Sequence, residues 1–403
     1  MKSVDASRRS FLGCLTAALA GGVGTGAPAT AARTGGEYLL EQGLTYLNTG
    51  TLGPCRRATL DETLKRWEYL EANPVRFYGK NGAEALAEKT RTVAASFLGC
   101  DLNEVVLTCS TTTGMNAVAQ GLRLKTGDRI LTTNHEHGGG LLCWRYLEKY
   151  YGVAIDTITL APEEHDTETI LARIRSGIRH ETRLITVSHV FSSTGLRMPI
   201  ADISAIAHSK GVLCIVDGAQ AAGAVRVNVK ELGCDAYATS GHKWLMGPKG
   251  TGLLYIAKDA QSVIRPMQFE ESYNTYSDGN GVVNLAAILG LASAIEYLQS
   301  VGMAKVEEHN LDLRNRLYER LANCKQLKLV SPVPGSAASP MLAGILPKNI
   351  DKKAFVQMLL NKHRLSIRPT HDQFGFNGIR FSMHIFNTAE DVDHAAAVIR
   401  NEV

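Results

Sequence analysis

Two ionisable side chains, Lys243 and Asp217, occur in apolar stretches where charged residues are uncommon. Asp217 directly follows the apolar run LCIV, and Lys243 lies in YATSGHKWLMGPKGTG, on the connection after the next expected strand. Burial disfavours the ammonium form of a lysine, and the neutral amine forms imines with carbonyl groups. An acid at a strand end either caps the following turn or holds a cationic ring nitrogen. Lys243 alone is also compatible with an ordinary surface lysine, so the neighbouring motifs decide between these interpretations.

Hydroxyl and imidazole groups follow other expected strands in the same way. In LTCSTTTGMNAVAQGL an apolar strand leads into a turn of serine, threonine and glycine and then into a helical pattern. Backbone N–H groups at such a helix start bind phosphate. An imidazole follows the strand RILTT, where it could stack on a ring, and a serine and a histidine flank the lysine as further phosphate donors. The residues concerned are Thr111, Thr112, His137, Ser240 and His242.

Taken singly, each of these features is also explained by an ordinary helix cap or an incidental side chain. In this order, however, they match the requirements of one cofactor. A lysine that forms an imine, paired with an aspartate at a pyridinium nitrogen, is the combination that binds pyridoxal 5′-phosphate. The glycines after Lys243 let the backbone approach a phosphate closely. Arg380, in GIRFSMHI, adds a planar guanidinium suited to binding a substrate carboxylate through two hydrogen bonds.

These residues resemble the class V aminotransferases of pyridoxal-phosphate fold type I. The resemblance spans roughly residues 40–400 and is strongest at DGAQ, SGHKWLMGPKGTG and GIRFSMHIFNTAEDVDHA. Within the family, YLNTGTLGP and NPVRF are most similar to the isopenicillin N epimerase-like branch. The resemblance implies a homodimer, because the sites of this family lie at the subunit interface.

The resemblance also implies a role for each site residue. Lys243 would be the Schiff-base lysine and would move a proton at the α-carbon of the substrate. Asp217 would keep the pyridine nitrogen protonated, Gln220 would hydrogen-bond the phenolic oxygen of the ring, and His137 would stack on the ring face. Arg380 would bind the substrate carboxylate. The phosphate would be held by Thr111, Thr112, Ser240 and His242, and Asn48 is assigned to the substrate pocket; no metal ligands are expected.

Two stretches depart from patterns found among relatives. Many relatives present a Gly-Thr pair from the neighbouring subunit to the phosphate, whereas this chain has Gly281 followed by Val282 in GNGVVNLAAILGL. Relatives that extract sulfur from cysteine carry a nucleophilic cysteine in the loop before the final arginine strand. The corresponding loop here, IRPTHDQFGFNG, has none, and Cys324 lies elsewhere, between a helix and a strand. A cysteine desulfurase is therefore disfavoured.

The elements that must position these residues alternate along the chain. Near-continuous apolar runs alternating with amphipathic helices predict a mainly parallel α/β sheet, of the seven-stranded type, covered on both faces. Ligands of such sheets bind beyond the carboxyl ends of the strands. The expected strands are residues 104–108, 128–133, 182–190, 211–217, 236–240 and 250–257, and the expected helices are 114–122, 141–151, 168–178 and 200–209.

A smaller α+β domain is expected at the C-terminus, where helices and strands mix without strict alternation. We divide the chain into a signal segment (1–32), a large cofactor-binding domain (33–285) and a small domain (286–403), with residues 33–60 packing near the small domain. Within the second half, helices are expected at 284–302, 306–324 and 352–363, and strands at 341–347 and 378–385.

The first residues read as an export signal. SRRSFLGCLTAALAGGVGTGAPATAA combines Arg8-Arg9 with a short Gly/Ala-rich apolar run and small residues ending near 31–32, which is typical of a twin-arginine signal with cleavage there. The apolar run is too short and too rich in glycine for a stable membrane span. We therefore expect export, to the periplasm or beyond, through the twin-arginine translocase. That route carries folded proteins and would allow the enzyme to acquire its cofactor in the cytoplasm.

Composition narrows the class of partner. The net charge of +4 is small, so the composition does not indicate binding to nucleic acid. The cysteines show no CxxC spacing, and an odd number remains after cleavage, so neither a disulfide scaffold nor a zinc site is indicated. Small-molecule amino acids or peptides are the expected substrates.

The motifs leave the reaction open. Amino transfer, epimerisation and side-chain elimination all rely on the cofactor to stabilise a carbanion, so they share these residues. We expect an exported aminotransferase acting on an amino acid or an amino-acid-containing peptide or secondary-metabolite precursor. The alternatives are an epimerase or lyase of the same fold, and a non-catalytic amine-binding protein. The retained Lys243, Asp217 and Arg380 argue against the last of these.

Overall fold

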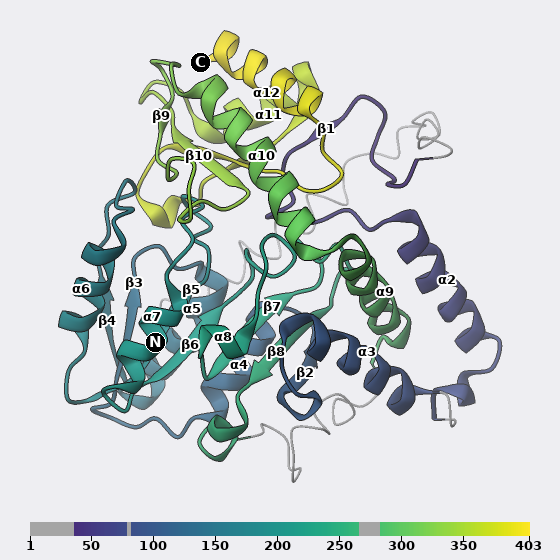
Figure 1. Ribbon diagram of the computed structural model, residues 1–403, viewed down its shortest axis with the longest axis vertical. Coiled ribbons are helices and arrows are strands. Elements are labelled where there is room, and N and C mark those ends of the chain that lie inside the picture. The colour runs from purple at the N-terminus through teal and green to yellow at the C-terminus, as the bar shows by residue number, and fades with distance from the viewer. Residues whose placement is uncertain (1–35, 79–81, 266–282) are drawn as a thin grey trace, which may run out of the picture.

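The computed structural model of the chain describes residues 36–78, 82–265 and 283–403 (Figure 1). The predicted signal segment (1–32) and the Gly281-Val282 pair lie outside the described residues. Everything said below about the structure refers to the described ranges.

A seven-stranded sheet forms the centre of the larger part of the molecule. All neighbouring strands are parallel except that β8 runs antiparallel to both of its neighbours. The predicted fold class, a mainly parallel α/β sheet, is therefore confirmed. The strands lie in the order β2 (Val105–Thr108), β8 (Gly252–Ile256), β7 (Ala236–Ser240), β6 (Leu213–Asp217), β5 (Thr182–Ser188), β3 (Arg129–Thr133) and β4 (Ala154–Ile158).

One strand of this seven-stranded sheet, β4, was not predicted from the sequence. It is the edge strand beside β3, and none of its residues is fully buried. An edge strand of mixed polarity lacks the continuous apolar run by which the central strands were recognised.

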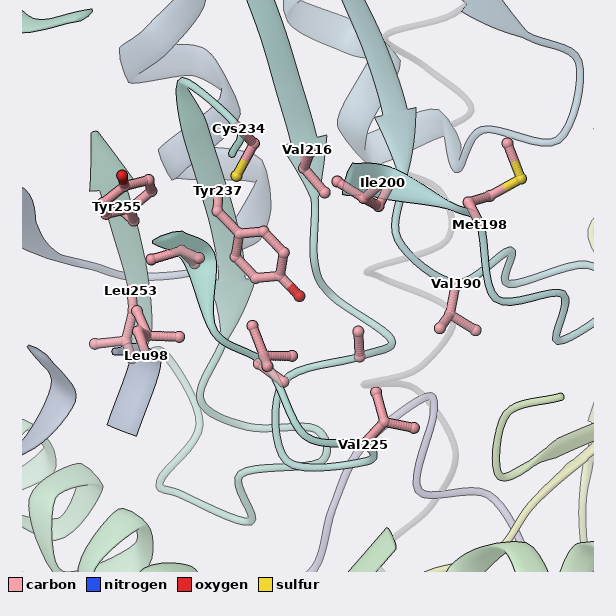
Figure 2. Close-up of a cluster of buried hydrophobic side chains, with 14 of the residues drawn as sticks. Leu98, Val190, Met198, Ile200, Val216, Val225, Cys234, Tyr237, Leu253 and Tyr255 are labelled. Atoms are coloured by element: carbon pink, nitrogen blue, oxygen red, sulfur yellow. The ribbon is translucent and has the colours of Figure 1, made fainter. Parts of the chain in front are cut away.

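Helices cover both faces of the sheet, and the side chains of each strand alternate between two cores. Along β6, Cys214 and Val216 belong to one core, whereas Ile215 belongs to the other. Figure 2 shows part of the first core, in which Val216 and Tyr237 lie with Leu253 and neighbouring apolar side chains. This core is covered by α6 (Thr167–Gly177), α7 (Ile200–His208) and α8 (Val229–Leu232), and the opposite core by α4 (Thr111–Gly121) and α5 (Gly138–Tyr151).

Helices α4 and α5 each begin three residues earlier than the apolar pattern predicts. Ser110 caps α4 by accepting a hydrogen bond from the Thr113 N–H at 3.2 Å. His137 caps α5 by accepting one from the Gly139 N–H at 3.1 Å. Capping side chains start a helix ahead of the first residue of its apolar pattern, so periodicity alone places the start too late. As a result, Thr111 and Thr112 lie in the first turn of α4.

Three helices pack together beside the sheet. They are α2 (Arg57–Glu71), α3 (Ala83–Leu98) and α9 (Leu285–Val301). After a bend of 81°, α9 is followed by α10 (Met303–Leu321), which extends into the C-terminal part (Figure 1). The division at 285/286 stays a prediction, since α9 contacts α2 and α3 as well as α10.

The C-terminal part has its own sheet and core. Four antiparallel strands lie in the order β12 (Arg368–Pro369), β13 (Gly378–Ser382), β10 (Met341–Ile345) and β9 (Lys328–Leu329). They share a core with α10, α11 (Lys352–His363) and α12 (Ala389–Glu402). The N-terminal strand β1 (Thr45–Tyr46) pairs in parallel with β11 (Leu365–Ser366), so the start of the described chain lies against this part.

Short 3-10 turns complete the described elements: η1 (Pro74–Tyr78), η2 (Leu102–Glu104), η3 (Lys258–Ser262) and η5 (Asp372–Phe374). Of the described helices, none is by itself long and apolar enough to cross a membrane; the bent pair α9 and α10 passes on length and composition only. The seven cysteines in the described ranges are all free thiols.

Candidate active site

The predicted site residues of the large domain gather at one edge of the sheet. Asp217 is the last residue of β6, Ser240 is the last residue of the neighbouring β7, and Lys243 follows on the connection to β8. Because β6 and β7 are parallel neighbours, their carboxyl ends lie side by side. The sheet therefore brings the lysine and the acid to the same edge.

The start of α4 is tied to the end of β7. The Thr111 N–H donates to Oγ of Ser240 at 3.1 Å, and the two hydroxyls share a hydrogen bond of 2.7 Å. Nearby, the Nδ1 atom of His242 is buried and has no hydrogen-bond partner within the described residues. Burying an unpaired polar atom costs free energy unless a ligand satisfies it. A helix start, two hydroxyls and an unpaired imidazole nitrogen together suit a phosphate.

Asp217 is buried and tightly enclosed. Its Oδ1 accepts a hydrogen bond from the Ala219 N–H at 2.9 Å. Burial raises the pKa of its carboxyl, and the Ala219 N–H and the Lys243 amine oppose that rise. On the other side, Gly140 leaves so little room that an ideal Cβ there would lie 2.5 Å from Oδ2. The carboxyl is therefore held in one orientation.

A second buried acid, Glu136, was not singled out from the sequence. It is 5% exposed, and its two oxygens accept hydrogen bonds from the hydroxyls of Thr133 at 2.8 Å and Ser188 at 2.6 Å. Burial raises its pKa to about 8, with Asp217 adding to the rise. Glu136 is thus mainly uncharged at neutral pH and adds little repulsion beside Asp217. In the sequence it resembles a solvated loop acid, so only the fold reveals its burial.

The environment of the Lys243 amine makes it more reactive as a nucleophile. Burial lowers its pKa to about 8, Asp217 opposes this shift, and Arg380 and Arg368 reinforce it. A lysine with this pKa has a substantial neutral fraction near neutral pH. The structure thus explains why a lysine stands in so apolar a stretch.

His137 lies close to the same cations. Burial lowers its pKa to about 3, and Lys243, His371 and Arg380 contribute to the shift. Its ring lies 5.0 Å from the ring of His371, with the two planes at 78°. A neutral imidazole is suited to stacking on a ring, and this role stays a prediction.

Arg380 reaches the site from the C-terminal sheet because side chains alternate along β13. Ile379 and Phe381 point into the core of that part, so Arg380 points the other way. Its Nη1 donates to the Ser192 carbonyl and its Nη2 to the Thr51 hydroxyl, both at 3.1 Å.

Arg380 is buried, with 4% of its surface exposed, and the Nε atom of its guanidinium has no hydrogen-bond partner among the described residues. Burial lowers its pKa to about 9, and Arg368 adds to that effect. No acidic side chain in the described ranges pairs with it. An arginine buried without an acid is a candidate anion-binding group.

The remaining two predicted residues are held by other parts of the chain. Asn48 Oδ1 accepts a hydrogen bond of 2.6 Å from the Thr51 hydroxyl, so Asn48 reaches Arg380 through Thr51. Gln220 accepts from the Trp244 indole N–H at 2.8 Å and donates to the Gly50 carbonyl at 2.9 Å. Only one N–H of Gln220 is left for a ring oxygen, and its assigned contact stays a prediction.

Several residues near the site were missed by sequence reasoning. Glu136 lies in TTNHEHGGG beside the predicted His137, and Arg368 and His371 lie in IRPTHDQFGFNG, the loop without a cysteine. Thr51 and Ser192 contribute through contacts between distant segments. Among these, Arg368 carried a usable signal, because an arginine within a loop expected to border the site is a candidate ligand for an anionic substrate.

Fold and site together define a pyridoxal-phosphate-dependent enzyme of fold type I. A mainly parallel seven-stranded sheet carries a lysine and an aspartate at its strand ends, and a smaller C-terminal part supplies an arginine. The sequence matches the family described as Aminotransferase class-V over residues 46–394, and the chain belongs to that family. This family membership confirms pyridoxal 5′-phosphate as the predicted cofactor.

Relatives of this chain include enzymes of different reaction types. The isopenicillin N epimerase of Amycolatopsis lactamdurans is 29% identical over 386 residues, which is 90% of this chain and 96% of that protein. The cysteine desulfurase of Haloferax volcanii is 30% identical over 341 residues, 77% of this chain and 78% of that protein. The structure of a cysteine desulfurase from Thermococcus onnurineus NA1 aligns with a TM-score of 0.79 and 25% identity, over 89% of this chain and 94% of that chain. These likenesses support the predicted family and its isopenicillin N epimerase-like branch.

Proposed function

We propose that this chain is an exported pyridoxal-phosphate-dependent aminotransferase. Its substrate would be an amino acid, or the free amino-acid end of a peptide or secondary-metabolite precursor. The observation that carries the proposal is that Lys243, Asp217 and Arg380 lie together at one site. Burial lowers the pKa of Lys243, Asp217 opposes this shift, and Arg380 adds to it. A nucleophilic amine, an acid and an unpaired guanidinium are the groups needed to act on an α-amino acid.

Each residue of the site would have a distinct role in the reaction. The bound cofactor would withdraw electrons from the α-carbon of the substrate and so acidify its hydrogen. Asp217 would hold the ring nitrogen, and the first turn of α4 with Ser240 and His242 would hold the phosphate. Lys243, whose pKa of about 8 lies near neutral pH, would accept a proton at the α-carbon and return it. Arg380 would orient the substrate by its carboxylate.

Epimerisation or side-chain elimination is the second candidate within the same chemistry. Two isopenicillin N epimerases are among the relatives, from Amycolatopsis lactamdurans and from Streptomyces clavuligerus. Desulfuration is less favoured, although desulfurases are also relatives. The loop before β13 has no cysteine, and its η5 turn offers only Asp372, Gln373 and Phe374.

A spectrum of the purified mature protein tests the proposal. We expect a yellow protein that absorbs in the visible and that borohydride bleaches, leaving the cofactor attached to Lys243. Lys243→Ala should prevent that attachment. An aminotransferase mixed with its amino-acid substrate alone should convert the cofactor to its aminated form in one half-reaction. Exchange of the α-hydrogen with solvent deuterium, without that form, would favour an epimerase; a colourless protein with added cofactor would refute the whole proposal.

A homodimer is part of the proposal. Large apolar side chains are exposed on α2 and η1, and exposed apolar surface of this kind can mark an interface between proteins. They are Leu64, Trp67, Tyr69, Val75 and Tyr78. Sedimentation analysis should give a dimer at micromolar concentration, and a monomer fully loaded with cofactor would contradict this.

A further inference from the structure

Two arginines face each other across neighbouring strands at the site. In the antiparallel pair β12–β13, Arg368 lies directly opposite Arg380. Directly opposite residues of an antiparallel pair project to the same face. The neighbours of both arginines, Ile367 and Ile379, belong to the core of the C-terminal part. Both arginine side chains therefore project away from that core, toward the site.

Neither arginine forms an ion pair with a described residue. Arg368 is half-buried, and its side chain donates one long hydrogen bond, at 3.4 Å, to Nε2 of His371. Its positive charge nevertheless reaches the site, because it lowers the pKa values of Lys243, His137 and Arg380. Like charges directly opposite on a sheet destabilise it unless something neutralises them.

The nearest acid along the chain is held elsewhere. Asp372 lies four residues after Arg368, yet its two oxygens pair with Nζ of Lys352 and of Lys353, each at 2.9 Å. Those two ion pairs lower the pKa of Asp372 to about 2, so Asp372 is a carboxylate that is already paired with the two lysines. Arg368 is left as a cation at the site with no acidic partner in the described ranges.

We propose that Arg368 binds a second anionic group of the substrate. This inference rests on the proposed function, in which Arg380 takes the α-carboxylate. One carboxylate has two oxygens and is satisfied by one guanidinium in a bidentate contact, so a second guanidinium on the same face requires a second anion. The substrate class is thereby narrowed to α-amino acids, or amino-acid ends of peptides, whose side chain carries another carboxylate.

His371 supports the orientation of Arg368. The guanidinium donates to Nε2 of His371, which must therefore be unprotonated at that atom. Burial lowers the pKa of His371, and Arg368 and Arg380 lower it further, which keeps the ring neutral. A neutral ring can accept this bond while leaving the other guanidinium N–H groups for a ligand.

Binding of unreactive acids to the cofactor-loaded protein tests the inference without measuring turnover. Succinate, glutarate and adipate would be compared with butyrate, valerate and caproate by calorimetry. In the wild type we expect at least one dicarboxylate to bind about 10- to 100-fold more tightly than its monocarboxylate of equal length, from one additional charge-assisted contact. Arg368→Gln should abolish this advantage and change monocarboxylate affinity less than about threefold. Arg175→Gln, an exposed arginine on α6, removes the same charge as a control.

Other outcomes would overturn the inference. If Arg368→Gln weakens both classes of acid equally, the two arginines share a single carboxylate. If it weakens neither, Arg368 is satisfied by another part of the protein. Should this variant fail to fold, Arg368→Lys keeps the charge without the bidentate geometry and should still lose most of the dicarboxylate advantage. Cofactor attachment at Lys243 and the half-reaction are measured separately, so failure of the proposed function is distinguishable from failure of this inference.

Discussion

Gly140 lies against the carboxyl of Asp217, where an ideal Cβ would come within 2.5 Å of Oδ2. The glycine occupies the first turn of α5, a helix that the sequence predicts to begin later. Close approach of this helix to the end of β6 thus fixes the acid that would hold the ring nitrogen. The absence of a side chain is the requirement here, since the position has an ordinary helical backbone.

Gly140→Ala should therefore displace Asp217. Overpacking of this kind typically costs about 1–3 kcal/mol, which corresponds to a loss of cofactor affinity of roughly 5- to 150-fold. Equilibrium titration of the apoprotein with cofactor measures this change. Gly138→Ala, at the first residue of the same helix, is the control, because its Cβ would meet only the flexible side chain of Gln373, whose Oε1 would lie 2.9 Å away. If both variants bind the cofactor with equal affinity, the contact between position 140 and Asp217 is not the cause of the loss.

Attachment of the cofactor should depend on pH through Lys243. The neutral amine is the attacking form, and its fraction rises as the pH increases through the pKa of about 8. The attachment rate of the apoprotein should therefore reach half of its maximum near pH 8. Because Asp217 raises this pKa and Arg380 lowers it, Asp217→Asn should shift the midpoint to lower pH and Arg380→Gln to higher pH.

Stopped-flow absorbance at a series of pH values measures these midpoints. Lys210→Gln, at an exposed position after α7, is the control and should leave the midpoint unchanged. Opposite shifts in the two site variants would identify charge as the cause. Shifts in the same direction would instead indicate a change of structure.

Arg380→Ala should damage turnover of carboxylate substrates far more than cofactor binding. Loss of a bidentate charge-assisted contact removes roughly 2–4 kcal/mol of binding, or about 30- to 1000-fold in kcat/KM. Amines without a carboxylate should show no comparable loss. Steady-state kinetics with matched amino acids and amines measures this difference, and a uniform loss for both would argue against carboxylate recognition by Arg380.

Lys230→Ala should destabilise the fold at neutral pH. Glu104 is fully buried, and Lys230 donates to it at 2.6 Å, with further bonds from the Lys258 and Asp101 N–H groups. We expect the free energy of unfolding to fall by about 1–3 kcal/mol, because half-exposed Lys230 loses less than a fully buried partner would. Denaturant unfolding measures the change.

The same variant has a pH signature. Burial raises the pKa of Glu104, but the bonds from Lys230 and the two N–H groups outweigh it, so the folded pKa is lowered. A carboxyl of this kind stabilises the fold above its unfolded pKa of about 4.3, and the contribution is lost as the pH falls through the folded value. The difference from wild type should therefore shrink at acidic pH. Lys353→Ala, which breaks an exposed pair with Asp372, should lower the free energy of unfolding much less than Lys230→Ala does.

Export is tested at Arg8 and Arg9. Changing both to lysine should retain the protein in the cytoplasm, folded and loaded with cofactor, because the twin-arginine route reads the pair itself. Cell fractionation with absorbance of the purified protein measures both properties, and Lys2→Arg is the matched control. Finding the wild type entirely in the cytosol would refute the export proposal.

The sequence alone determined the fold class, the cofactor and the order of the site residues. Residues 236–240 and 352–363 were predicted as a strand and a helix, and the structure has β7 and α11 at the same bounds. Central strands of a parallel sheet are apolar on both faces, and amphipathic helices repeat their apolar residues, so both leave a local signal. Asp217 ends one such strand and Lys243 lies three residues after the end of the next, which made their position at the sheet edge predictable.

Tertiary structure decided what depends on partners distant in the chain. The burial that keeps Glu136 uncharged, the close approach of Gly140 to Asp217, and the register that sets Arg368 opposite Arg380 all join separate segments. Local composition reports the hydrophobicity of a segment but not which segment it meets. A pKa, a steric limit or a pair of like charges arises only where two segments meet, so these properties of the site came from the structure.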